Sequence, residues 1–108
     1  MKIDRNKVLA KYNGHCAYCG KEITVKEMQV DHIQAKRYNG TDDFNNLNPS
    51  CRRCNHYKRA SGLESFRWLM KTIHTRIEAD YITKVAIDYG IITVLPFDGI
   101  FYFEKFNK

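Results

Sequence analysis

Residues 30–58 read VDHIQAKRYNGTDDFNNLNPSCRRCNHYK, and this stretch decides the fold. It contains one C-x-x-C pair, Cys51 and Cys54, and a second pair, Cys16 and Cys19, precedes it in the chain. Two residues between thiolates allow one tight turn to offer both sulfurs to a tetrahedral ion, and a second turn completes the set. The spacing therefore predicts a Cys₄ zinc site.

The expected role of this zinc follows from its ligands. Thirty-one residues separate the two pairs, which is longer than the commonest zinc-ribbon spacing, so we expect a folded insertion between them. A closed Cys₄ site leaves no coordination position for water, and such a zinc stabilises structure rather than performing chemistry. The alternatives are two disulfides or four unrelated thiols, and a reducing compartment favours zinc.

The apolar segments and the length of the chain predict its location and its number of domains. The N-terminal sequence MKIDRNKVLAKYNG has no apolar run of signal-peptide length. No segment approaches the roughly 20 apolar residues of a membrane span. We therefore expect a cytoplasmic protein without a membrane partner. A length of 108 residues fits one domain, which we place at residues 1–108.

The positive charge is concentrated in one half of the chain. The formal net charge is +6, with 12 Lys and Arg against 6 Asp and Glu in residues 1–60 and 6 of each in residues 61–108. A basic surface on one part of a small protein attracts polyanions, most often nucleic acid. A charge surplus that serves only solubility is the alternative.

Local patterns predict short elements around the cysteines. Asp4 is expected to cap a first helix that ends at residues 13–14. β-forming residues predict a strand within residues 25–33 and a second one near residues 44–47. A short helix is expected over residues 54–59.

The C-terminal half predicts helices followed by a β-hairpin. Apolar residues recur at helical spacing from Phe66 to Tyr89, as one bent helix or as two. Residues 91–95 and 100–106 are rich in β-forming residues and flank a Pro-Phe-Asp-Gly turn, so we expect a hairpin there. Its aromatic side chains are able to stack on bases, but packing in the core is the favoured interpretation.

A second group of residues in the 30–58 stretch is suited to metal-assisted hydrolysis. Such chemistry on a phosphodiester needs oxygen ligands for Mg²⁺ or a similar ion, and a base that activates water. Asp31 and Asn55 offer the oxygens, and neutral His32 offers the base. Strict strand alternation sends Asp31 and His32 to opposite faces, so a shared site requires the strand to end or bend there. In the alternative interpretation, Asp31 only caps a turn.

The order of these residues resembles the motif of the HNH endonuclease family in its four-cysteine form. The matching segments are Asp31-His32-Ile33, Asn46-Leu47 and the run from Cys51 to Lys58. The resemblance implies an α+β fold with a ββα-metal core, in which two antiparallel strands and a helix hold one divalent ion. The motif core would span about residues 16–60, with the helices and the hairpin of residues 61–108 as an extension.

The resemblance also implies a role for each matching residue. His32 is the general base, and Asp31 and Asn55 bind a catalytic Mg²⁺ or Mn²⁺ that stabilises the phosphate and the leaving 3′ oxygen. Asn46 is the middle asparagine, which is expected to fix its loop and orient His32. Three neighbours compete for these roles as turn-forming or ligating residues: Asn45, Asn48 and His56.

The implied function is a small phage or bacterial endonuclease that hydrolyses phosphodiester bonds in DNA, as a nick or a double-strand break. The expected products carry 5′-phosphate and 3′-hydroxyl ends. The alternative is a zinc-stapled nucleic-acid-binding module that cleaves nothing. RNA as the substrate, and either a monomer or a homodimer, are compatible with the sequence. Candidate contacts to the phosphate backbone are the cations of the motif: Lys36, Arg37, Arg52, Arg53, Lys58 and Arg59.

Overall fold

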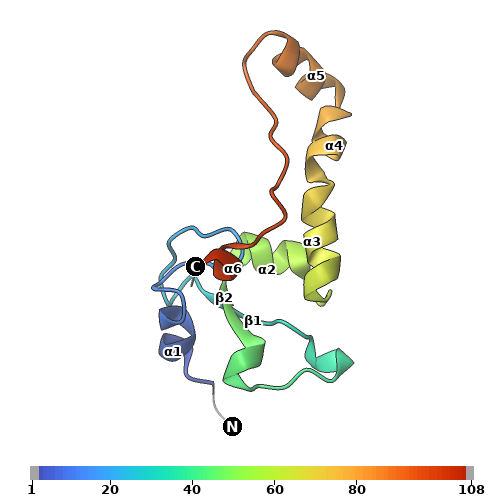
Figure 1. Ribbon diagram of the computed structural model, residues 1–108. Helices are drawn as coiled ribbons and strands as arrows, with labels where there is room; N and C mark the ends of the chain where they lie inside the picture. The colour runs from blue at the N-terminus through green and yellow to red at the C-terminus, as the bar shows by residue number, and fades with distance from the viewer. Residues whose placement is uncertain (1–2, 107–108) are drawn as a thin grey trace. The chain divides into compact units, whose positions relative to one another are not determined.

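The computed structural model describes residues 3–106 and shows an α+β protein with a two-stranded antiparallel sheet and several helices (Figure 1). The chain divides into two compact units. The first contains the described residues up to Leu63 and those from Phe101 onward, and the second is Glu64–Ile100. The assignment of residues 1–108 to one domain stays a prediction.

The sheet belongs to the first unit and pairs the two motif segments. β1 (Gln29–His32) runs antiparallel to β2 (Leu47–Ser50), with Asp31 opposite Asn48. All four residues of β2 are buried, so the strand lies inside the unit rather than at its surface. β1 is shorter than the predicted strand, because residues 25–27 form a turn in which Glu27 accepts hydrogen bonds from the Thr24 backbone and hydroxyl.

Two α-helices flank this sheet in the sequence, and both begin at a side-chain cap. In α1 (Arg5–Ala10) the predicted cap is confirmed, because the Asp4 carboxylate accepts from the N–H groups of residues 6 and 7. α2 (Arg52–Lys58) begins after Cys51, whose sulfur accepts from the N–H of Cys54 at 3.3 Å. Short 3₁₀ turns, η1 (Lys36–Tyr38) and η2 (Phe44–Asn46), shape the loop between the strands.

The helical pattern of the second half forms three helices rather than one or two. These are α3 (Leu63–Lys71), α4 (Ile73–Glu78) and α5 (Tyr81–Asp88), and the chain turns at Gly90 with a φ of 73°. Within the second unit, Arg67 pairs with Glu64 and donates to the carbonyl of Gly99 at 2.6 Å. None of the helices within residues 3–106 has the length and apolar character needed to cross a bilayer.

The predicted C-terminal hairpin is wrong. Neither residues 91–95 nor the described residues from 100 onward form a strand, and the second run instead contains α6 (Tyr102–Lys105). The N–H groups of Tyr102 and Phe103 donate to the carbonyls of Tyr18 and Ala17. Local β-propensity is overridden because the turn at the first cysteine pair supplies acceptors to this segment, while the Glu104 carboxylate accepts from the N–H of the residue that precedes α6.

The aromatic residues of this segment pack in the core of the first unit, as the favoured interpretation expected. Phe101 is 2% exposed and meets the Tyr18 ring edge-on at a centroid distance of 5.3 Å. A Cβ atom added at Gly20 would lie 2.6 Å from the Tyr102 ring, and the φ of Gly20 is +83°. Only glycine avoids both problems, so it allows α6 to lie against the cysteine turn.

Replacing Phe101 with alanine is expected to lower the free energy of unfolding by about 3 kcal/mol, because it leaves a cavity beside Tyr18. Urea denaturation followed by circular dichroism measures the loss. The control is Tyr81→Ala, since Tyr81 is 81% exposed. Equal stability of Phe101→Ala and the wild type would contradict the packing of this segment on the first cysteine turn.

Candidate metal centre and adjoining cleft

The four cysteines converge in the first unit. The sulfurs of Cys16, Cys19, Cys51 and Cys54 all lie within 4.8 Å of one another, and those of Cys19 and Cys51 are 3.9 Å apart. Four Zn–S bonds of about 2.3 Å in a tetrahedron would place the sulfurs about 3.8 Å apart. The cluster therefore fits a zinc ion, as the spacing predicted.

Backbone hydrogen bonds hold the two cysteine turns together. The N–H of Cys51 donates to the sulfur of Cys16 at 3.3 Å, and the N–H of Ala17 donates to the carbonyl of Pro49 at 2.8 Å. The first bond favours a thiolate at Cys16, since hydrogen bonds to the charged form stabilise it. The second bond connects the first turn to β2, so the ligand set and the sheet form one arrangement.

The thiols also perturb one another. Hydrogen bonds from Cys19 and Cys54 hold the pKa of Cys16 far below its usual range, whereas hydrogen bonds with Cys16 and Cys19 raise the pKa of Cys54. Four adjacent thiolates repel one another, so they do not all ionise in the protein alone. A divalent cation removes this restriction and allows all four to ionise.

A cleft next to the cysteine cluster brings together the residues proposed for catalysis. It has a volume of about 310 Å³ and is lined by Asp31 and His32 at the end of β1 and by Asn55 of α2. Three of the predicted phosphate contacts line it as well: Lys36, Arg37 and Arg59. Arg52 and Arg53 are exposed on the first turn of α2 and are not among its lining residues. The acid, the histidine, the asparagine and three cations therefore all line one open space.

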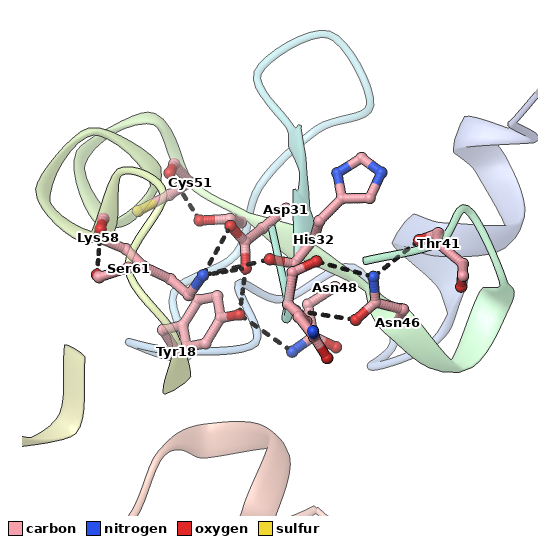
Figure 2. A network of polar contacts seen from close by, with 11 residues as sticks. Tyr18, Asp31, His32, Thr41, Asn46, Asn48, Cys51, Lys58 and Ser61 are labelled. Carbon is pink, nitrogen blue, oxygen red and sulfur yellow. Dashed lines mark hydrogen bonds and ion pairs between the residues drawn. The ribbon is translucent and has the colours of Figure 1, made fainter. Parts of the chain in front are cut away.

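Asp31 is the centre of a buried polar network (Figure 2). Its side chain is 4% exposed, accepts a hydrogen bond from the Tyr18 hydroxyl and pairs with the Lys58 ammonium at 3.3 Å. Asn48 donates to the Tyr18 oxygen at 3.3 Å, and Lys58 also donates to the carbonyl of His32. The network joins the first cysteine turn, both strands and α2, so it fixes the geometry of the cleft wall.

Burial dominates the electrostatics of this network. It raises the pKa of the Asp31 carboxyl, and the hydrogen bond from Tyr18 and the charge of Lys58 act in the opposite direction. Burial, and then the charge of Asp31, raise the pKa of the Tyr18 phenol, so Tyr18 stays protonated and keeps donating. Removing the Asp31 carboxylate from water costs free energy, and its contacts with Tyr18 and Lys58 offset this cost.

The structure corrects the predicted role of Lys58. The sequence placed its charge on the surface of α2 as a phosphate contact, but its side chain is 0% exposed. The ammonium is turned inward, where the carboxylate of Asp31 compensates its charge. Its helix neighbour Arg59 is exposed and keeps the predicted access to solvent.

His32 is held by a carboxylate that sequence reasoning missed. Its Nε2 atom lies 2.7 Å from Asp42 Oδ1, and the Lys36 ammonium lies 3.2 Å from Asp42 Oδ2. Hydrogen bonds from His32, and then from Lys36, lower the pKa of Asp42. The imidazole points away from the Asp31 carboxylate, as strand alternation expects (Figure 2). The one sequence signal for Asp42 is the acidic pair Asp42-Asp43 within the motif.

Asn46 fixes the loop between the strands. Its amide nitrogen donates to the carbonyls of Thr41 and Gln34 at 2.7 and 3.1 Å, and its amide oxygen accepts from the Gln34 N–H at 2.9 Å (Figure 2). Its own carbonyl accepts from Ile33, the residue after His32. All polar atoms of this amide side chain thus hold the loop, which fits the role of the middle asparagine. The competing Asn48 belongs to the Tyr18 network instead.

Two residues with oxygen donors that could hold a hard divalent ion line the cleft. The Asp31 carboxylate and the Asn55 amide are ligands that Mg²⁺ and Mn²⁺ accept. A carboxylate has about four acceptor sites, and the contacts of Asp31 with Tyr18 and Lys58 leave room for one more. The Asn55 side chain has no hydrogen-bond partner among residues 3–106, so its oxygen is available. An ion here would share Asp31 with the Lys58 ammonium.

Comparison with known families agrees with this site. The family model of the HNH endonucleases matches residues 16–61. The match begins at the first cysteine and ends just beyond α2, so it contains the cysteine cluster and every residue that lines the cleft. No curated protein and no solved structure matches the chain significantly. Nuclease or nucleic-acid-binding activity is typical of this family.

The purified protein is expected to contain about one zinc per chain, and Cys54→Ser to lose it with much of the folded structure. Elemental analysis and circular dichroism measure both. Arg53→Ser is the matched control, because Arg53 lies between two cysteines without being a ligand. Two disulfides in place of bound zinc would contradict the site.

Replacing Lys58 with methionine is expected to lower the free energy of unfolding by on the order of 3 kcal/mol, because it leaves the buried Asp31 charge without its ion pair. Urea denaturation provides the measurement. Lys26→Met is the control, since Lys26 is exposed. If both variants unfold at the same urea concentration as the wild type, the ion pair does not hold the cleft.

Proposed function

We propose that the protein is a metal-dependent HNH endonuclease that hydrolyses phosphodiester bonds in DNA. The observation that carries the proposal is the cleft in which Asp31, His32 and Asn55 meet beside three cations. A binding surface alone would need the cations and would have no use for a carboxylate, an imidazole and an amide at one place. The ββα-metal core corresponds in this proposal to β1, β2 and α2.

Each of the four proposed catalytic residues has one task in this reaction. His32 accepts the proton of the water whose oxygen attacks the phosphorus, while the bond to the 3′ oxygen breaks. Asp31 and Asn55 would hold the divalent ion, which supplies Lewis-acid stabilisation of the phosphate charge when bound. Asn46 holds the loop that follows β1.

The cations of the cleft dock the substrate. Lys36, Arg37 and Arg59 line the cleft and are exposed, so they can approach phosphate oxygens, and Lys36 would then share its ammonium with Asp42. Contacts of this kind position the backbone and carry no sequence information. Binding through them weakens steeply with salt, because each contact releases a counterion.

A second candidate is a zinc-stapled nucleic-acid-binding module that does not cleave. The observation that favours it is the burial of Asp31 at 4% exposure in an ion pair with Lys58, which is also what a purely structural aspartate would show. The two candidates differ in one property: only the nuclease needs the imidazole of His32.

The wild type is expected to convert supercoiled plasmid to nicked or linear DNA with Mg²⁺ or Mn²⁺, and His32→Ala to lose at least about 100-fold in rate, since general-base catalysis contributes that much. Agarose electrophoresis over time measures both. His56→Ala is the control, because His56 is exposed on α2 and does not line the cleft. Intact plasmid with every divalent ion, together with retained DNA binding, would favour the binding module.

A further inference from the structure

Asp42 is the one acidic residue of the loop between the strands that touches the proposed base. Its Oδ1 atom lies 2.7 Å from His32 Nε2, and Lys36 Nζ lies 3.2 Å from its Oδ2. The side chains of His32 and Asp42 are 22% and 28% exposed, so the pair is half-buried rather than a fully solvated contact. The Asp42 carboxylate accepts a hydrogen bond from His32 with one oxygen and from Lys36 with the other. Rotating the carboxylate away would break both contacts.

The loop geometry makes this contact specific to Asp42. The Thr41 carbonyl is fixed by the Asn46 amide, and the Thr41 hydroxyl accepts from the N–H of Asp43 at 3.2 Å. Asp42 lies between these two anchors, so its backbone is held on both sides. The loop thus presents one carboxylate to the end of β1, where His32 is the last residue.

A carboxylate next to Nε2 determines which nitrogen of the imidazole carries the lone pair that can accept a proton. A neutral imidazole has one N–H donor and one lone pair, and a carboxylate is an acceptor only. Asp42 therefore stabilises the tautomer with the proton on Nε2, which leaves the lone pair on Nδ1. Carboxylates that contact a functional histidine in this way fix both its tautomer and the direction of its ring.

We propose that Asp42 is a positioning residue that orients His32 and makes Nδ1 the proton acceptor, and this inference rests on the proposed function. The Nδ1 lone pair takes one proton from water, and the oxygen of that water forms the new bond to phosphorus. The electron pair of the broken bond goes to the 3′ oxygen, which takes up a proton from solvent. His32 then releases its proton to solvent, so the protein returns to its starting state.

Asp42→Ala is expected to lower kcat for plasmid cleavage about 10- to 100-fold, because the His32 ring loses the carboxylate that fixes its direction and tautomer. Asp42→Asn should recover part of the loss, since its amide oxygen still accepts from Nε2–H. Asp43→Ala is the matched control, because it removes the same charge from the neighbouring position of the same loop. A loss of kcat in Asp43→Ala as large as in Asp42→Ala would overturn the proposal, because it would trace the effect to loop charge.

A second readout is independent of cleavage. Nitrogen NMR of the histidine ring should show His32 with a protonated Nε2 in the wild type and in Asp43→Ala, and a mixture of tautomers in Asp42→Ala. Unchanged tautomers in Asp42→Ala would overturn the positioning role even if the protein is a nuclease. Conversely, full cleavage by His32→Ala would overturn the proposed nuclease mechanism itself, so the two failures are distinguishable.

Discussion

The convergence of four thiols is the constraint on which the first unit depends. Cys16 and Cys51 are far apart in the sequence, yet the N–H of one donates to the sulfur of the other. The same cysteine that completes the ligand set also caps α2, so the direction of this helix is tied to the cluster. Because α2 carries Asn55 and Lys58, the cluster indirectly positions one wall of the cleft. A zinc ion bound by the four cysteines would therefore influence the geometry of the cleft without contacting it.

The buried Asp31 network is the second connection between scaffold and cleft. Tyr18 lies between the first two cysteines and donates to Asp31, while Lys58 pairs with the same carboxylate from the end of α2. A lone charge at this depth would be unstable, and its partners come from the two segments that the cysteines bring together. Asp31 thus stabilises the fold through its buried contacts and is also a candidate metal ligand. His32 and Asn55 line the cleft and do not belong to this buried ion pair.

Features determined by local chemistry were predictable from the sequence, and those determined by distant partners were not. The C-x-x-C spacing predicted the thiol cluster, and Asp4 predicted the first cap, because both depend on neighbours in the chain. Lys58 resembled a surface cation, since its partner lies 27 residues away. The hairpin prediction failed because residues 100–106 find their acceptors on the first cysteine turn. Asp42 was missed because adjacent acids in a polar loop are usual in turns.

The central claim is that two different metal sites share one small framework, with sulfur ligands at one and oxygen ligands at the other. Anomalous diffraction from crystals grown with zinc and Mn²⁺, recorded at the absorption edge of each metal, tests this claim most directly. Zinc signal at the four cysteines and manganese signal between Asp31 and Asn55 are the expected result. Manganese that is absent from the cleft, while zinc occupies the cysteines, would contradict the account.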